Sequence, residues 1–419
     1  MFISRLRGST YLTLLRYRNV KVVIATNFVE TLAVAYLVGY YLKMLIYDMG
    51  GAESLGIYSM LGNALLWLSP IVGGVFSDAF GRRKTLLACL PLSVFGLLTL
   101  AIIHSPTTVM VLALLLQVSF ILAAPARTVL LSESVPLEHV GKAFSLLFFT
   151  EGVASMLGYE VFGYVLSATN APTAFIASGL LFSTSLILSA YAQETLKQKR
   201  TRLNLSSALL GTFAEGIRFI GRRASLLLLL VYLAFDAFTS SIAAPFVPTF
   251  LKDVLSLSIM EISTLYTFCG VATIIGSLMA GFLVDRFRRS LISLIIRDVL
   301  SLPLLLAFVL APPPVVAASL AFSALIAQLS IGLNRYLVEK TEQEHRSLVQ
   351  GFMNAVRQVS GIPGPLLGIF LWKISPRIVF MVPAATIPVG VLILLMILKI
   401  DKKPTSSRRI GATLIDAHP

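Results

Sequence analysis

Four ionisable residues lie inside long apolar stretches of this sequence, where a charge is costly and usually serves a function. Glu30, Asp236 and Glu151 are acids, and Arg357 is a base. Glu30 stands about ten residues into its stretch, which corresponds to ~15 Å along a helix. A carboxyl group in such a low-dielectric site can load and release a proton, or bind a cation. We therefore predict that these side chains bind a small solute or carry protons.

The four residues form two pairs with the same spacing. Asp236 follows Glu30 by 206 residues, and Arg357 follows Glu151 by 206 residues. A repeat of half the chain predicts two related halves, and the four side chains could then face one central cavity. The alternatives are structural. Glu30 or Asp236 could be a protonated acid that joins helices, and Glu151 could form a salt bridge with Arg357 between the halves.

Other charged residues also occur in or near the apolar stretches, and four of them bear on the prediction. Arg297 and Asp298 are adjacent, so they point ~100° apart on a helix. We expect that they do not pair face to face and that at least one bonds to another helix. Arg127 is expected to snorkel or to bind a loop. Glu160 is expected to face water.

The composition requires a membrane. Apolar residues make up 57% of the chain and charged residues 13%, whereas soluble proteins carry about 25% charge. Apolar runs long enough to span a bilayer, about 20 residues each, recur along the whole chain. We predict an all-α membrane protein with twelve transmembrane helices in two pseudo-symmetric six-helix halves. The expected spans are 20–45, 55–77, 85–104, 107–131, 142–166, 172–192, 225–250, 258–284, 290–311, 314–336, 350–372 and 376–398.

The polar stretches divide the chain. We expect an N-terminal half at 1–192, a cytoplasmic linker at 193–224, a C-terminal half at 225–398 and a basic tail at 399–419. Apolar residues of the linker fall on one helical face, which favours an interfacial helix; a flexible linker is the alternative. Prolines mark several breaks between spans, and the glycines and prolines of 361–368 should bend the eleventh span.

Lysine and arginine orient the chain. They crowd the N-terminal arm, the loop after the second span, the linker, the loop after the eighth span and the tail, while the opposite side keeps only Lys43, Lys252, Lys373 and Arg377. Positive charge gathers on the cytoplasmic side, so we predict a multi-pass protein of the cell membrane with both termini cytoplasmic. The net charge of +14 then reflects loops beside anionic lipid and implies no nucleic-acid partner.

Several kinds of chemistry have no residues to carry them. The sequence has no glycine-rich phosphate loop with a lysine, and its four histidines stand in loops or tails without ligand spacing. Cys89 and Cys269 lie in apolar runs, which argues against a disulfide or a metal site. No nucleophile lies near a base in the sequence. We therefore expect no enzyme, no cofactor, no metal and no ATP-driven pump.

A compact polar motif ends the second span. Gly74 lets a neighbouring helix approach, and the Asp78 carboxylate could bind the free amide groups at another helix N-terminus. Gly81 permits a tight turn, while Arg82 and Arg83 could grip carboxylates. Together these residues predict a breakable latch between helices. The alternative is that the basic residues only set the topology.

A weaker copy of the motif follows 207 residues later. Gly281, Asp285 and Arg289 correspond to Gly74, Asp78 and Arg82, whereas Arg288 replaces the second glycine. A run of Gly-x-x-x-Asp-x-x-Gly-Arg-Arg-Lys between the second and third of twelve spans resembles the signature loop of the major facilitator superfamily. The resemblance covers the whole chain, and it implies that Asp78 latches the two halves on the cytoplasmic side when the protein faces outward.

This resemblance also implies a function. We expect a secondary active transporter that moves a small solute by alternating access, coupled to protons, with Glu30 as the first candidate carrier and Asp236 as the second. Acids at the midplane favour export of cationic or drug-like compounds. The alternatives are an uncoupled facilitator, a proton symporter of an anionic metabolite (which Arg357 and Arg297 would favour), and a non-transporting membrane receptor or scaffold.

Overall fold

The structure is a computed structural model that describes residues 13–103, 105–196, 217–221, 223–286, 290–342 and 345–402. These residues form helices and short connections, with no strand among them. The first group of helices comprises α3 (Arg18–Val34), a π-helical turn (Leu37–Tyr41), α4 (Leu42–Phe80), α5 (Arg82–Leu100), α6 (Pro106–Glu133), a 3₁₀ turn (Leu137–His139), α7 (Val140–Ala168) and α8 (Ala171–Ala190).

The second group begins after the predicted linker. It comprises α10 (Ala224–Ala243), a 3₁₀ turn (Ala244–Phe246), α11 (Val247–Thr249), a π-helical turn (Phe250–Val254), α12 (Ile259–Arg286), α13 (Leu291–Leu310), α14 (Pro313–Ala327), a 3₁₀ turn (Gln328–Ser330), α15 (Ile331–Lys340), α16 (Arg346–Gly361), α17 (Gly364–Ile374) and α18 (Pro376–Lys402). Most of the linker and nearly all of the tail lie outside the described residues, so the predicted interfacial helix does too.

The predicted twelve-helix membrane fold is confirmed. Among the described residues, nine helical segments are long and apolar enough to cross a membrane, and α3 with the first part of α4 forms a bent pair that also qualifies. Gly51 has a φ of 66° inside α4, a value that favours glycine, so the chain changes direction there and α4 contributes to two passes. The eleventh span is α16 with α17, which are separated between Gly361 and Gly364 as the glycine and proline pattern predicted.

The ends of the helices follow local chemistry. α6, α14 and α18 each begin at a proline, a residue that suits the first turn because its missing amide would be unpaired there anyway. Asn170 precedes α8, and its side chain accepts a hydrogen bond from the amide of Thr173 at 2.9 Å. Gly81 separates α4 from α5 with a φ of 104°. These breaks turn one apolar chain into an antiparallel bundle.

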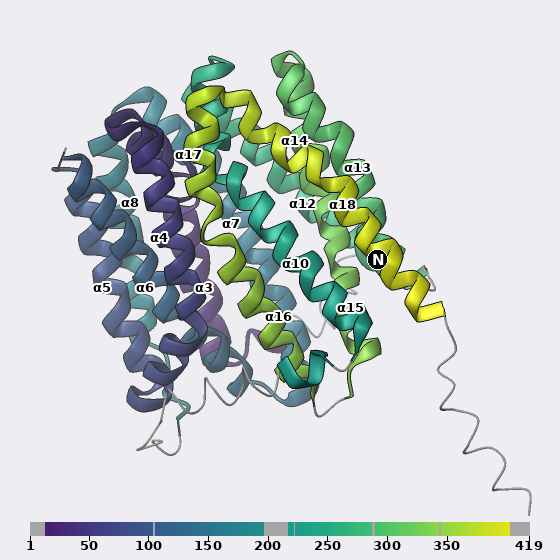
Figure 1. The fold of residues 1–419 in the computed structure, drawn as a ribbon. Helices are drawn as coiled ribbons and strands as arrows, with labels where there is room; N and C mark the ends of the chain where they lie inside the picture. The colour runs from purple at the N-terminus through teal and green to yellow at the C-terminus, as the bar shows by residue number, and fades with distance from the viewer. Residues whose placement is uncertain are drawn as a thin grey trace, which may run out of the picture.

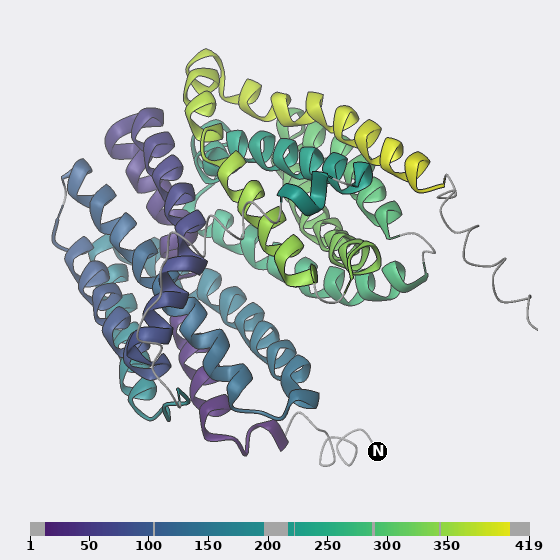
Figure 2. The ribbon, with the colours of Figure 1, turned by 60° about the horizontal axis from the view of Figure 1, so that its bottom comes forward.

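The helices form two halves, α3–α8 and α10–α18, which Figure 1 shows side by side and Figure 2 shows from the end that lies below in Figure 1. Packing between the halves runs mainly along α7 with α12 and along α4 with α16 and α17. Two ends can be distinguished. We call the end that holds Asp48, Glu53, Lys252 and Lys373 the far end, and the end that holds Arg18, Arg82, Arg223 and Lys340 the basic end.

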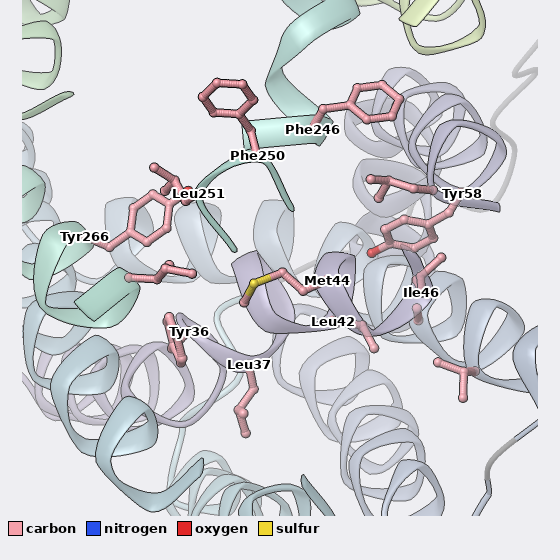
Figure 3. Packing of buried hydrophobic residues seen from close by; sticks show 14 of the residues in the cluster. Tyr36, Leu37, Leu42, Met44, Ile46, Tyr58, Phe246, Phe250, Leu251 and Tyr266 are labelled. Atoms are coloured by element: carbon pink, nitrogen blue, oxygen red, sulfur yellow. The ribbon is translucent and has the colours of Figure 1, made fainter. Parts of the chain in front are cut away.

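The halves share a hydrophobic core towards the far end. The largest buried cluster contains residues of both halves, and Figure 3 shows Tyr36 and Met44 of the first half near Leu251 and Tyr266 of the second. The next two clusters, nearer the basic end, each belong to one half. Burial of apolar surface therefore holds the halves together at one end of the molecule.

Polar contacts between the halves have the same distribution. At the far end, Lys252 pairs with Asp48 and Lys373 pairs with Glu53, while the Trp372 indole donates to Tyr47 Oη at 3.0 Å. The Tyr40 and Tyr266 rings stack with centroids 3.6 Å apart. At the basic end, the described ion pairs all stay within one half. The ion pairs and the shared core that join the halves therefore lie towards the far end.

Candidate functional site

Glu30 lies in a pocket of the N-terminal half. The pocket has a volume of about 480 Å³ and is lined by α3, α6, α7, the π-helical turn and the start of α4. Glu30 is only 3% exposed, because α3 places it against neighbouring helices and not against solvent. A buried carboxylate needs a cationic or hydrogen-bonding partner, and the fold supplies one from another helix.

That partner is Arg127 of α6. Its Nη2 pairs with Glu30 Oε2, and its Nη1 donates to Asn27 Oδ1 at 2.7 Å. The prediction that Arg127 snorkels or binds a loop is therefore wrong. Its side chain is long enough to cross from α6 to α3, where the buried acid offers a better partner than the membrane surface does.

The second oxygen of this acid differs from the first. Glu30 Oε1 is buried without a hydrogen-bond partner in the described part of the chain. The Ser185 hydroxyl of α8 faces the carboxylate but makes no hydrogen bond of normal geometry. An unpaired buried acceptor is costly, and a proton on Oε1 would relieve that cost if Ser185 or a water accepted it.

Glu151 lines the same pocket from α7. Ser155 and Tyr159 follow it at intervals of four residues, so the three side chains share one face of the helix. Glu151 makes no ion pair among the described residues. The structural alternative of a Glu151–Arg357 salt bridge is wrong for this conformation, because Arg357 lines a different pocket in the other half.

The pocket of the C-terminal half has a volume of about 300 Å³ and contains Asp236 and Arg357. Arg297 Nη2 lies 3.3 Å from Asp236 Oδ1 and 2.6 Å from Asp298 Oδ1. The predicted failure of Arg297 and Asp298 to pair is wrong. Adjacent side chains do leave a helix in directions ~100° apart. The arginine side chain is nevertheless long enough to fold back, so its guanidinium group reaches the neighbouring carboxylate.

Tyr232 completes this cluster and was not predicted. Its hydroxyl donates to Asp298 Oδ2 at 2.8 Å, and Arg297 Nη2 donates to the same hydroxyl at 2.6 Å. Tyr232 precedes Asp236 by one helical turn, so the two face the same side of α10. This spacing of four residues could have identified Tyr232 from the sequence. The expectation that at least one member of the Arg297–Asp298 pair bonds to another helix is confirmed.

The four predicted central residues therefore line two pockets, with Glu30 and Glu151 in one half and Asp236 and Arg357 in the other. No ion pair joins the two sets among the residues described. Glu160 was expected to face water, and the structure places it half-buried. Thr264 and Thr267 of α12 donate to its carboxylate at 3.4 and 3.2 Å, so it bonds across the two halves.

The predicted latch residues make contacts within the N-terminal half. Arg82 lies 2.8 Å from Asp78 and 3.3 Å from Glu133. Glu194 accepts hydrogen bonds from the amides of Arg82 and Arg83 at 2.9 and 3.1 Å, so it caps the N-terminus of α5.

The glycines of the latch behave differently from each other. The positive φ of Gly81 provides the predicted turn. At Gly74, a Cβ atom would meet nothing within 4 Å among the described residues, so no helix approaches closely there in this conformation. Of the second copy, Gly281 and Asp285 belong to α12 with side chains outside the description, and Arg289 lies outside the described residues.

Comparisons with known proteins agree with this architecture. The sequence profile described as Major Facilitator Superfamily matches residues 23–240 and 229–415. The multidrug resistance protein MdtH of Blochmanniella floridana is 22% identical over 183 residues, which is 43% of this chain and 41% of that protein. The alignment therefore spans about two fifths of that relative's length.

Solved transporters share the fold at low identity. The nucleoside transporter NupG superposes with a TM-score of 0.71 at 14% identity, covering 91% of this chain and 99% of that one. A POT family transporter in complex with 5-aminolevulinic acid has a TM-score of 0.73 at 12% identity, covering 91% and 96%. These similarities establish the arrangement of helices.

Proposed function

The chain belongs to the major facilitator superfamily, and we propose that it is a proton-coupled secondary transporter that moves a small solute across the cell membrane by alternating access. The single observation that carries the proton coupling is Glu30. It is a buried carboxylate in a pocket of solute size, with one oxygen held by Arg127 and the other without a hydrogen-bond partner among the described residues. A multi-pass transporter of this family needs no catalytic group.

The proposed mechanism uses the exchange of partners at Glu30. While the carboxylate is ionised, Arg127 neutralises it. When a proton binds Glu30, its attraction to Arg127 falls, and Arg127 becomes available to a solute or to Asn27 alone. A change in charge at one residue then changes which groups face the pocket, which is the coupling a symporter or an antiporter requires.

The packing of the halves supports alternating access. They are joined at the far end by ion pairs, a ring stack and a shared core, whereas the described ion pairs at the basic end each stay within one half. We assign the basic end to the cytoplasm from its positive charge, so this conformation is open inward. Asp78, which would then be released from the opposite half, pairs instead with Arg82.

The environment of the acids bears on the solute. Glu30 is paired with Arg127, and Asp236 lies beside Arg297. A cationic or drug-like solute would have to displace an arginine from either acid, which removes the reason for favouring cations. The proton symporter of an anionic metabolite gains support from the same observation.

The test first identifies a ligand and then measures its transport. A thermal-shift screen of small cations, anions and sugars detects a ligand, since binding to the folded state stabilises it. The radiolabelled ligand is then followed in proteoliposomes under an imposed pH gradient. Glu30→Gln should lose gradient-driven accumulation and keep ligand exchange at equal concentrations. Glu138→Gln, an exposed acid at the basic end, is the matched control.

Two outcomes would contradict the proposal. Gradient-driven accumulation in Glu30→Gln at the wild-type level removes Glu30 as the proton carrier. Flux that ignores the gradient in the wild-type protein favours the uncoupled facilitator. If no solute binds, the non-transporting receptor or scaffold gains support.

A further inference from the structure

Lys43 lies inside the N-terminal half and makes no ion pair with any residue that the structure describes. The sequence placed it with the bases of the outer surface, and Lys252 and Lys373 do lie there, each paired with an acid. Lys43 instead lines the pocket of Glu30. Its only recorded contact in the described part of the chain is with the Tyr40 ring, whose centroid lies 5.9 Å from the ammonium nitrogen.

The same lysine lines a second pocket of about 210 Å³. Gln117 of α6 contributes to it: its Nε2 donates to Tyr58 Oη at 3.0 Å, while its Oε1 is buried without a partner. Asn63 lies on the same pocket and donates to Gly361 O of the other half at 3.0 Å. A group that entered here would meet one free cation and one free hydrogen-bond acceptor.

The acids of the first pocket leave Lys43 available. Glu30 is paired with Arg127. Glu151 precedes Tyr159 by two helical turns on α7, about 12 Å along the axis, and Tyr159 packs edge-on against Tyr40 beside Lys43. No carboxylate lies within ion-pair distance of Lys43 among the described residues. An unpaired charge at this depth is costly, and a bound anion would offset the cost.

We propose that Lys43 is the anion-binding residue of the transport site and that the solute carries a carboxylate, sulfonate or phosphate group beside a hydrogen-bond donor. The anionic group pairs with the Lys43 ammonium, and the donor reaches Gln117 Oε1. This inference rests on the proposed transport function and names its substrate class. Anion binding by Lys43 does not depend on the Glu30–Arg127 pair or on the Asp236–Arg297 pair.

A cysteine at Gly39 can report on this charge. Gly39 lines the same pocket, one turn before Lys43, and a Cβ atom built there meets nothing within 4 Å. The Gly39→Cys variant is made with Cys89→Ala and Cys269→Ala, which remove the two native thiols. Its rates of reaction with an anionic and a cationic methanethiosulfonate reagent are measured in detergent, and their ratio cancels any change in thiol reactivity.

The expected result is a change in that ratio. Lys43→Met in the Gly39→Cys background should lower the anionic-to-cationic rate ratio by about tenfold, because one unit charge a few ångströms away is lost in a medium of intermediate dielectric constant. Lys43→Arg should keep the ratio within about twofold. Lys142→Met, the same substitution at the basic end of α7, should leave it unchanged. Lys43→Gln provides a second neutral variant if the methionine variant does not fold.

A protection experiment tests the ligand class. Benzoate, benzamide and benzylamine share one frame and differ in charge, and each is tested at millimolar concentration for slowing the reaction of G39C with N-ethylmaleimide. Benzenesulfonate and phenyl phosphate are added as further anions. At least one anion should protect the lysine and arginine forms and fail to protect Lys43→Met, while benzamide and benzylamine should protect none.

The proposal is overturned by a rate ratio that does not change in Lys43→Met, by equal protection from the neutral or cationic compounds, or by a lack of protection from all three anions. These measurements need no gradient and no flux. They can therefore fail while Glu30→Gln still abolishes proton-driven transport, and they can succeed when it does not, so the two proposals are tested separately.

Discussion

The two acid–base clusters occupy related positions in the halves but are built differently. In the N-terminal half, one acid, Glu30, is held by one base, Arg127 of α6. In the C-terminal half, Arg297 of α13 stands between Asp236 and Asp298, and Tyr232 bonds to two members. Glu30 and Asp236 follow the repeat of the chain, whereas the bases come from helices that the repeat does not relate.

This difference separates two roles. A cluster of one acid and one base has two charge states that differ by a whole unit at the pocket, so a single proton alters it strongly. A cluster of two acids, a base and a phenol can shift a proton or a hydrogen bond internally and keep its structure. We infer that the N-terminal cluster responds to protonation, whereas the C-terminal cluster mainly stabilises the packing of its helices.

The largest effect is expected from Arg297→Met. It leaves Asp236 and Asp298 without the guanidinium group that contacts both, and breaking a buried charge cluster in this way costs about 5 kcal/mol. Unfolding by SDS titration measures the loss. Asp298→Asn in the same background should recover only part of it, because Asp236 remains unpaired. Full recovery would show that Asp236 takes no part in the cluster.

Arg127→Met should have the next largest effect, about 3 kcal/mol, because it leaves one buried carboxylate instead of two. Adding Glu30→Gln should restore most of the stability, since a neutral amide is far less costly to bury than a charge. A double-mutant cycle on the unfolding free energies measures the coupling. Additive losses would mean that the two side chains do not form a pair in the folded protein.

Tyr232→Phe should cost less, about 1–2 kcal/mol, because it removes one hydroxyl that serves Asp298 and Arg297 but leaves their ion pair intact. The control is Tyr191→Phe, an exposed tyrosine, which should unfold like the wild type. If both variants lose the same stability, the hydroxyl of Tyr232 does not stabilise the C-terminal cluster.

The smallest effect on stability is expected at the far end. Lys373 and Glu53 are both more than half exposed, and exposed ion pairs are screened by water and salt. Lys373→Met should therefore leave the unfolding free energy unchanged within error. A loss as large as that of Arg127→Met would mean that exposure does not distinguish the outer ion pairs from the buried clusters.

Much of the fold could be predicted because it depends on short-range properties. Apolar runs of membrane length, prolines at helix starts and the glycines of 361–368 each act over one or two turns of helix, and the structure confirms the twelve spans and the break in the eleventh. For the candidate site, the sequence could predict which residues take part but not which partners they bind. Glu30, Asp236, Glu151 and Arg357 stand out because charge is rare in such runs, whatever its partners are.

The sequence by itself determined the membrane class and the two halves, since these follow from hydropathy and from the repeat along one chain. Only the tertiary structure decided the partners: that Arg127 crosses to Glu30, that Arg297 folds back onto Asp298, and that Lys43 points into a pocket. The physical reason is the length of the basic side chains. A lysine or arginine side chain spans the gap between packed helices, so its partner depends on which helices become neighbours and not on the residues beside it in the chain.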